Sequence, residues 1–493
     1  MLKPIDTCGL PWLWERARLD PDGFALRFES QELAFAELAA RAEAAASRLA
    51  SLGLREGDRM ALLMDSSIRS VELIHAAQRL GIVLVPLNTR LTEAELGVLL
   101  DASDPSALVY DASYSNAIGG LRHDRIRRVE STAEFDSIPL TRIPEIKPVK
   151  RNAPYTIIFT SGTTATPKGA VLTNGNHFAS ALASRSNLGA EPSDRWLDLL
   201  PLYHVAGLSI LLRSVIDGSG VVLHRGFDAG AANEALREHR ITLLSVVATM
   251  LARMLDDNRG RLYPRSLRCV LAGGGPVPAD LVLRAAEVGV PVAPTYGLTE
   301  TASQVATASP KDAIRKPGSC GRPLLGNQIK IVDADNSGRG EIAVKGPSVM
   351  AGYFRATAET HAVLRDGWLH TGDIGHFDRD NFLYVDDRRA DLIVTGGENV
   401  YPAEVEAVLV SHPAVAEAAV YSIGDPKWGH SVAAMIVPRA GMQVGAEELR
   451  EWCSSRLARF KIPRAFSFAD ALPSTASGKI KRAALRESSR SVR

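Results

Sequence analysis

The order of apolar patterns in the first 300 residues restricts the fold more than any other feature of the chain. Residues 35–52 carry apolar side chains at helical spacing, and residues 59–64 form a short apolar run typical of a buried strand. A helical pattern over 70–80 and an apolar, β-branched run over 81–87 repeat this order. Because parallel strands need crossover helices between them, the alternation predicts an α/β fold with parallel-type sheets covered by helices.

The pattern changes near residue 326 and again near residue 386. Residues 327–333, 340–345 and 381–385 have strand character and are separated by turns rich in Asp, Asn and Gly, which predicts a β-rich layer. Five charged residues then stand among positions 386–391, and a short strand, a glycine turn and a helix begun by Pro402 follow. We therefore predict a large N-terminal domain over 1–386, a boundary at 387–391, and a small α+β domain over 392–493.

Composition excludes several classes of protein. The chain has 493 residues and a formal net charge of +1, which gives no general attraction to nucleic acid or to an anionic membrane. Its four cysteines are far apart and form no CxxC pair, so neither a disulfide framework nor a zinc site is indicated. No signal-peptide core and no apolar run of about 20 residues is present. We predict a cytoplasmic protein with no nucleic-acid partner and no membrane span; weak membrane association and a homo-oligomeric state are left open.

The strongest local motif is the sequence FTSGTTATPKG at residues 159–169. A short apolar strand leads into five hydroxyl side chains, two glycines and Lys168. Such a loop can wrap a polyphosphate, because glycine permits close approach of the backbone, hydroxyl and N–H groups donate hydrogen bonds, and lysine balances the charge. The motif is not a Walker A loop, which requires GxxxxGK[ST]. Taken alone, it fits a solvated linker equally well.

Four other segments carry charged side chains suited to nucleotide chemistry. Residues 296–300, YGLTE, combine an aromatic ring, a hydroxyl and a carboxylate, which suit a purine, a phosphate oxygen and Mg²⁺. Asp373 ends the sequence LHTGD and could accept both hydroxyls of a ribose. Arg388 in the charged boundary could reach the ribose or a phosphate, and Lys479 on a loop of small residues could stabilise a transferring phosphoryl group. Singly, these four are weak signals: a lone Glu is more often a surface acid, the TGD segment is an ordinary turn, Arg388 is a linker charge, and a basic tail is favoured for the Lys479 segment.

The order and spacing of the five motifs resemble those of the acyl-adenylate-forming superfamily, which includes acyl-CoA synthetases, luciferases and the adenylation domains of peptide synthetases. The resemblance covers nearly the whole chain. It implies a mobile C-terminal lid domain turning about a hinge at 387–391, with the active site between the two domains. It also implies an AMP-forming ligase that uses ATP and Mg²⁺ to activate a small carboxylic acid and passes the acyl group to the thiol of coenzyme A.

The resemblance assigns roles to individual positions. Tyr296 would stack on adenine, Thr299 would contact the α-phosphate, Asp373 and Arg388 would bind the ribose, and Lys479 would meet the α-phosphate and the substrate carboxylate. The implied ATP-binding residues are Thr160, Ser161, Gly162, Thr163, Thr164, Lys168, Gly274, Tyr296, Gly297, Thr299, Asp373, Arg388 and Lys479. The implied catalytic residues are Lys479, Thr299, Glu300 and His204, with Glu300 holding Mg²⁺. The implied CoA-binding residues are Gly396, Gly397, Glu398, Trp428 and Phe460.

Two positions depart from the usual superfamily pattern, and a third differs from some relatives. Ala165 stands where the phosphate loop usually has a glycine, and Ala390 stands at the hinge position that is commonly Asp or Lys. Ile462 occupies a place where some relatives have a basic residue, which puts contacts with the CoA phosphates in doubt. His204 matches the aromatic gate of the acid pocket, although without the resemblance it would be an ordinary core or surface histidine.

Several stretches are most similar to the 2-succinylbenzoate–CoA ligases of menaquinone biosynthesis. They are residues 194–197, 200–216, 271–276, 299–304 and 387–406. An aromatic diacid needs apolar walls and a donor for its second carboxylate, so the acid-binding candidates are His204, Arg213 and Ser303, with Gln304 beside it. Arg213 could equally face solvent, and Ser303 could equally be part of an apolar wall.

Three alternatives to this function stay open from the sequence. The chain could be a CoA ligase for another aryl or medium-chain acid, a stand-alone enzyme that loads a carrier-protein thiol, or a nucleotide-binding protein without turnover. Intact Glu300, Asp373 and Lys479 oppose the last of these. Trp428 and Phe460 favour coenzyme A over a carrier protein.

We expect Lys479→Ala to abolish adenylate formation and to leave thioester formation from supplied acyl-AMP largely intact. The resemblance places this lysine in a mobile loop that serves only the first half-reaction. Single-turnover assays of the two half-reactions would measure both effects. An equal loss in both half-reactions would contradict the assignment.

Overall fold

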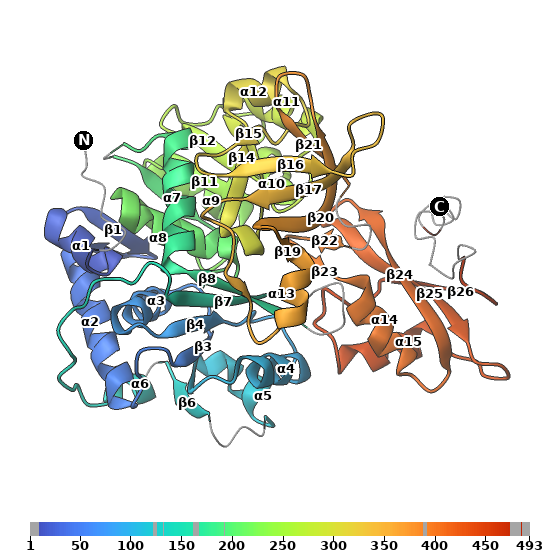
Figure 1. Cartoon of the computed structure of the whole chain (residues 1–493), viewed down its shortest axis with the longest axis horizontal. Helices are drawn as coiled ribbons and strands as arrows, with labels where there is room; N and C mark the ends of the chain where they lie inside the picture. The colour runs from blue at the N-terminus through green and yellow to red at the C-terminus, as the bar shows by residue number, and fades with distance from the viewer. Residues whose placement is uncertain are drawn as a thin grey trace. The chain divides into compact units, whose positions relative to one another are not determined.

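The computed structural model describes residues 9–121, 126–131, 133–160, 167–191, 193–387, 392–473 and 485. The chain divides into two compact units (Figure 1). Met1–Thr89, Ala102–Ile158 and Gly169–Asp386 make up the first unit, and Arg90–Asp101, Phe159–Lys168 and Asp387–Arg493 make up the second. Ser161, Gly162, Thr163, Thr164, Ala165, Arg388, Ala390 and Lys479 lie outside the described residues.

The predicted alternation of helices and strands is confirmed in the first unit. The helix predicted over 35–52 is α2 (Phe35–Ser51), and the run at 59–64 is β3 (Arg59–Leu63). The next pair is α3 (Ile68–Leu80) and β4 (Val83–Pro86). Helix α3 begins after Ser67, whose side chain accepts a hydrogen bond from the backbone N–H of Ser70, and it ends at Gly81 in the left-handed region.

Two large sheets form most of the first unit. The seven-stranded sheet has the order β18 (Gly352–Tyr353), β8 (Lys168–Thr173), β7 (Pro154–Thr160), β4, β3, β5 (Ala107–Tyr110) and β6 (Arg127–Glu130). The nine-stranded sheet has the order β15 (Arg322–Pro323), β14 (Ser303–Thr307), β13 (Val292–Leu298), β12 (Cys269–Ala272), β11 (Leu243–Val246), β9 (Arg195–Asp198), β10 (Gly220–Leu223), β1 (Phe24–Phe28) and β2 (Gln31–Ala34). In the nine-stranded sheet, β9, β11, β12 and β13 run parallel, whereas β14 is antiparallel to β13.

The helices of the first unit cover these sheets. Besides α2 and α3, they are α1 (Trp12–Leu19), α5 (Ser115–Ile118), α6 (Ala133–Ser137), α7 (Asn174–Leu188), α8 (Val205–Asp217), α9 (Ala229–Glu238), α10 (Ala248–Asn258), α11 (Ala279–Glu287), α12 (Pro310–Arg315) and α13 (Thr357–Val363). Helix α4 (Glu93–Ser103) begins in the second unit, and two 3₁₀ turns lie at Ala112–Tyr114 and Thr299–Thr301. Helix α8 is buried along nearly its whole length, in a core that also contains Tyr155 of one large sheet and Trp196 of the other.

The predicted β-rich layer is a five-stranded sheet. Its strands are β16 (Gln328–Val332), β17 (Gly340–Lys345), β20 (Trp368–Phe377) and β19 (Leu364–Arg365), with β21 (Leu383–Asp387) paired to β20. Val344 and Leu383 from this layer share an apolar cluster with Tyr296 and Val305 of the nine-stranded sheet. The layer is therefore attached to the edge of the large sheet through a common core.

The second unit has a separate core. The hairpin β22 (Ile393–Thr395) and β23 (Glu398–Val400) precedes α14 (Pro402–Val410), and β24 (Val415–Asp425), β25 (Gly429–Pro438) and β26 (Ala465–Phe468) form a sheet beside α15 (Ala446–Ser454). Lys461 is buried and its Nζ lies 2.7 Å from Glu95 Oε1 and 2.6 Å from Glu404 Oε1. Across the described part of the chain, no helix is both long and apolar enough to span a bilayer.

We expect Gly321→Ala to destabilise the first unit by at least about 2 kcal/mol. Gly321 has a φ of +83°, and a Cβ there would lie 2.1 Å from the carbonyl carbon of Thr307. Thermal unfolding followed by circular dichroism would measure the effect. Gly226→Ala is the matched control, because an added Cβ at Gly226 meets open space and its φ is not in the left-handed region. Equal melting temperatures for the two variants would contradict the packing argument.

Candidate active site

Four of the predicted site residues of the first unit lie at one edge of the nine-stranded sheet. Because β9, β11, β12 and β13 are parallel, their carboxyl ends share this edge. His204 follows β9, Gly274 follows β12, and Thr299 and Glu300 follow β13. Open α/β sheets bind ligands in the crevice outside the carboxyl ends of their strands. The topology therefore places these residues where a ligand site is expected.

Tyr296 joins this edge to the β-rich layer. It lies in β13 and is 2% exposed, and its hydroxyl donates a hydrogen bond of 2.7 Å to Oδ2 of Asp373 in β20. Asp373 is itself 4% exposed, and a buried carboxylate requires such partners. The structure thus brings together two motifs that stand 77 residues apart in the chain.

Close backbone packing shapes the turn that carries Thr299 and Glu300. A Cβ on Gly297 would lie 1.8 Å from the carbonyl oxygen of Ser303, so only glycine fits opposite the start of β14. Ala302 and Ser303 both have positive φ, at +50° and +97°. The buried hydroxyl of Ser180 donates a 2.6 Å hydrogen bond to the carbonyl of Ala302. Strained backbone of this kind concentrates at functional sites, where surrounding contacts hold it in place.

Glu300 is partly buried and is held from one side. Its Oε1 accepts a 2.8 Å hydrogen bond from the hydroxyl of Tyr353, and its backbone carbonyl accepts one from the N–H of Met350. Within the described ranges, no three His, Cys, Asp or Glu side chains form a group that could hold a metal ion by themselves. A single oriented carboxylate fits Mg²⁺ that arrives with nucleotide phosphates, since Mg²⁺ commonly takes one or two carboxylates plus phosphate oxygens.

His204 caps the buried helix α8. It is the residue before the first turn, and its ring lies 4.7 Å from that of Tyr203 at an angle of 62°. An added Cβ on Gly207 would meet the carbonyl oxygen of Pro201 at 2.5 Å, so the helix start is packed tightly against the preceding loop. Gly274 turns the chain after β12 with a φ of +73°. Both predicted residues lie at the expected edge.

Arg213 lies on the same helix, about two and a half turns after His204. It is 3% exposed, so the solvent-facing alternative is wrong. Its guanidinium lies over the ring of Trp196 at 5.1 Å. Burial lowers the pKa of Arg213 to about 10, against the opposing charges of Asp217 and Asp198. Burial also raises the pKa of Asp217 to about 6 and raises that of Asp198 well above its usual value.

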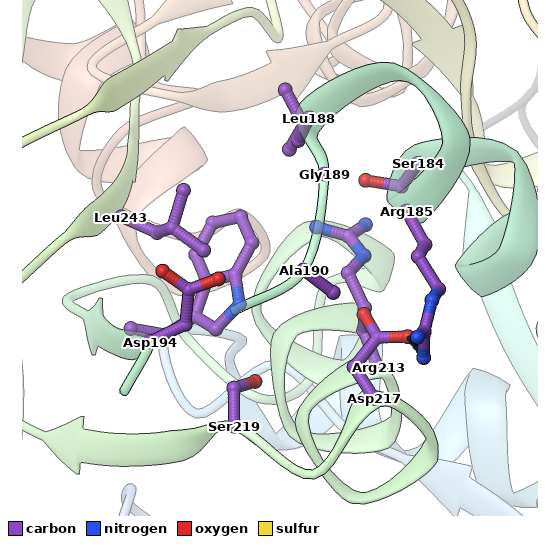
Figure 2. Close-up of a pocket in the computed structure, with 11 residues that line it drawn as sticks. Ser184, Arg185, Leu188, Gly189, Ala190, Asp194, Arg213, Asp217, Ser219 and Leu243 are labelled. Carbon is purple, nitrogen blue, oxygen red and sulfur yellow. Dashed lines mark hydrogen bonds and ion pairs between the residues drawn. The ribbon is translucent and has the colours of Figure 1, made fainter. Parts of the chain in front are cut away.

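A small pocket lies beside Arg213 and has room for about one water molecule. Figure 2 shows Arg213, Asp217 and Arg185 at one side of it. The pocket is lined by Ser184, Arg185, Leu188, Gly189, Ala190, Asp194, Trp196, Arg213, Asp217, Ser219 and Leu243. His204 and Ser303, the other two predicted acid-binding residues, are not among its lining residues, and Ser303 stands at the start of β14.

The predicted CoA-binding residues belong to the second unit. Gly396 has a φ of +57°, and an added Cβ would lie 2.6 Å from the ring of Trp428. Its N–H donates a 3.0 Å hydrogen bond to the carbonyl of Trp428, so these two residues are held together. Glu398 is buried and lies 3.3 Å from Arg90. Phe460 packs against the core of this unit.

The phosphate loop is described only at its two ends. Thr160 ends β7, and Lys168 begins β8. The Thr160 hydroxyl donates a weak 3.4 Å hydrogen bond to the carbonyl of Lys168. Tyr353, which holds Glu300, was not predicted from the sequence. Residues 352–353 carry no signal beyond a glycine and an aromatic residue, and the contact with Glu300 exists only in the folded chain.

Comparison with known proteins identifies the family. The family model described as AMP-binding enzyme matches residues 13–354, and the model of the AMP-binding enzyme C-terminal domain matches residues 404–479. The chain belongs to the AMP-binding enzyme family. The resemblance inferred from the motifs is therefore confirmed.

Individual relatives are similar to this chain over nearly its full length. A 2-succinylbenzoate–CoA ligase of Bacillus licheniformis is 44% identical, over 96% of this chain and 98% of the relative. A double mutant of o-succinylbenzoate CoA synthetase from Bacillus subtilis, bound to the product analogue OSB-NCoA, is 42% identical with a TM-score of 0.92, over 97% of this chain and 98% of that one. The Bacillus subtilis enzyme in complex with ATP and magnesium ion is 41% identical with a TM-score of 0.75, over 96% of this chain and 98% of that one.

We expect Glu300→Gln to slow adenylation by at least about tenfold and to weaken its dependence on Mg²⁺. The amide keeps the shape of the side chain but loses the negative charge that a divalent cation requires. Initial rates of diphosphate release over a Mg²⁺ titration would measure both effects. Glu287→Gln, on the exposed end of α11, is the matched control. An unchanged rate and titration would exclude Glu300 as a metal ligand.

Proposed function

We propose that this chain is a 2-succinylbenzoate–CoA ligase that forms 2-succinylbenzoyl-CoA, AMP and diphosphate through an acyl-adenylate. The observation that carries the proposal is the 44% identity, over almost the full length of both chains, to a protein of that name. The TM-score of 0.92 to a synthetase bound to a product analogue supports it. A cytoplasmic location is part of the proposal and is supported by the intracellular occurrence of ATP and coenzyme A.

The first half-reaction activates the acid. A carboxylate oxygen attacks the α-phosphorus of ATP, the bond to the diphosphate breaks, and a mixed anhydride with AMP is formed. Thr299 would donate to the α-phosphate and Asp373 would accept the ribose hydroxyls, so the protein contributes positioning and electrostatics rather than a covalent intermediate. Mg²⁺ held by Glu300 would neutralise charge on the phosphates. Lys479, Arg388 and the loop at 161–166 complete the proposal outside the described residues.

The second half-reaction transfers the acyl group. The thiol of coenzyme A attacks the carbonyl carbon of the adenylate, and AMP leaves with the electrons of the broken bond. We assign the CoA-binding surface to Gly396, Gly397, Glu398, Trp428 and Phe460. The tight contact between Gly396 and Trp428 supports this, because a Cβ at position 396 would collide with the Trp428 ring, so glycine allows two of the proposed CoA-binding residues to lie against each other. The division into 1–386, 387–391 and 392–493, with the lid turning between half-reactions, belongs to the same proposal.

The acid-binding residues of the proposal are His204, Arg213 and Ser303. Arg213 is supported by its buried positive charge, since a buried cation suits the distal carboxylate of a diacid. Its pocket neighbours Asp194, Ser219 and Leu243 stand at or just before the starts of β9, β10 and β11, whereas His204 follows the end of β9. Asp217 and Asp198 already oppose its charge, so a substrate carboxylate would compete with them. Tyr296 is proposed to contact adenine, although its ring is almost fully buried and its hydroxyl holds Asp373.

We expect 2-succinylbenzoate to exceed benzoate and octanoate in kcat/KM by at least about 10²-fold. A buried donor that is left without the second carboxylate makes monoacids poor substrates. AMP release over a panel of acids, with and without coenzyme A, would measure this. A flat preference would indicate a CoA ligase of broader specificity, and transfer to a carrier-protein thiol in place of coenzyme A would indicate a loading enzyme.

We expect Arg213→Leu to weaken 2-succinylbenzoate selectively and to spare monoacids. The ratio of kcat/KM values for the two kinds of acid measures this independently of the fraction of folded enzyme. Asp217→Asn is the companion variant, because it alters the same buried charge cluster without removing the cation. If Arg213→Leu still strongly prefers 2-succinylbenzoate, the proposed substrate stands and only the proposed role of Arg213 is wrong.

A further inference from the structure

The strand that carries Asp373 contains a bulge. In the ladder between β17 and β20, Glu341 pairs with Ile374 and Ala343 pairs with His370. Two steps along β17 therefore correspond to four steps along β20, and the extra residues fall within 371–373. Bulges interrupt the ladder and re-aim side chains, and they are common beside active sites.

Two side chains take up the backbone N–H groups that the bulge removes from the ladder. Oε1 of Glu341 accepts the N–H of Gly372 at 2.9 Å. Oγ1 of Thr371 accepts the N–H of Asp373 at 3.1 Å and donates to the carbonyl of Ile342 at 2.7 Å. Gly372 has a φ of +75°, which turns the chain at this point. Glu341 and Thr371 thus replace the missing strand partner.

Glu341 is itself fixed in place. Its Oε2 lies 2.8 Å from Nδ1 of His370, whose N–H donates to the carboxylate. The carboxylate therefore contacts residues on both sides of Thr371. Its side chain is 28% exposed and that of His370 is 13% exposed. A partly exposed acid is not required for the apolar packing of β17, whereas one of its hydrogen bonds is with Gly372 in the bulge and the other is with His370 directly before it.

The bulge determines where the Asp373 carboxylate lies. Asp373 is nearly buried and its Oδ2 accepts the hydroxyl proton of Tyr296 from the neighbouring sheet. If the backbone at Gly372 relaxed toward a regular ladder, the carboxylate would move relative to Tyr296 and to the carboxyl edge of the nine-stranded sheet. The position of this acid thus depends on a second acid that stands on a different strand.

We propose that Glu341 is a positioning residue for ribose recognition: by binding the N–H of Gly372 while held by His370, its carboxylate fixes the bulge that aims Asp373. The inference rests on the proposed role of Asp373 in binding the ribose hydroxyls. Glu341 touches no substrate itself. Its loss therefore affects discrimination at the ribose more than binding of the phosphates or the acid.

The test compares ATP with 2′,3′-dideoxy-ATP, which lacks both hydroxyls that Asp373 would bind. Calorimetric titration of the full-length enzyme with each nucleotide, without any acid, gives a ratio of dissociation constants. We expect Glu341→Ala to reduce the preference for ATP by at least about fivefold, and we expect the same of Asp373→Ala. A loss of overall stability would weaken both nucleotides equally and leave the ratio unchanged.

Conservative variants separate the hydrogen bond from bulk effects. Glu341→Gln should keep the wild-type ratio, because an amide oxygen still accepts the N–H of Gly372. Glu341→Asp retains charge but is too short to reach Gly372 and His370 together, so it should lose part of the preference. If Glu341→Ala fails to fold, Glu341→Asp replaces it as the variant that tests the inference. Lys345→Ala, on an exposed position of the same strand, is the control for β17.

Each outcome has a definite reading. Suppose that Asp373→Ala loses the preference for ATP over 2′,3′-dideoxy-ATP. A wild-type ratio of the two dissociation constants in Glu341→Ala would then overturn the inference. If Glu341→Ala is unfolded, a wild-type ratio in Glu341→Asp would overturn it. A wild-type ratio in Asp373→Ala would overturn both the ribose role and the inference. Neither result bears on the proposal that the chain is a 2-succinylbenzoate–CoA ligase, because the AMP-release assay over a panel of acids tests that proposal separately.

Discussion

The hydrogen bond between Tyr296 and Asp373 is the interaction on which the arrangement of the candidate site depends. It links the nine-stranded sheet to the β-rich layer through two side chains that are almost fully buried. A carboxylate taken out of water is costly unless hydrogen-bonded, so this contact fixes how the layer docks on the sheet edge. The YGLTE and TGD motifs lie together because the fold must satisfy this acid.

Backbone geometry around this bond is held by unusually close contacts. Gly297 admits no Cβ opposite Ser303, and the next turn passes through two non-glycine residues with positive φ. On the other side of the bond, the bulge at residues 371–373 is held by Glu341 and by the hydroxyl of Thr371. Rigid strands followed by constrained turns can hold functional groups more precisely than long loops. The two motifs therefore owe their positions in part to Ser303 and Glu341, which belong to neither motif.

Buried charge is the second constraint on the first unit. Helix α8 is packed on all sides, yet it carries Arg213 and Asp217, and Asp198 is buried on the neighbouring strand. Removing such charges from water is expensive, and Arg213 and the two carboxylates lower one another's penalty because their charges are opposite. The opposite directions of their pKa shifts follow from the same cause, because burial disfavours every charged form.

The sequence by itself determined the fold class, the strand and helix order and the family, because hydrophobic periodicity and short motifs are local properties of the chain. Only the tertiary structure decided that Arg213 is buried, that Tyr353 holds Glu300 and that Glu341 holds the bulge before Asp373. These facts depend on which residues meet across sheets. A side chain that is solvated in one packing is buried and paired in another, and no local pattern distinguishes the two.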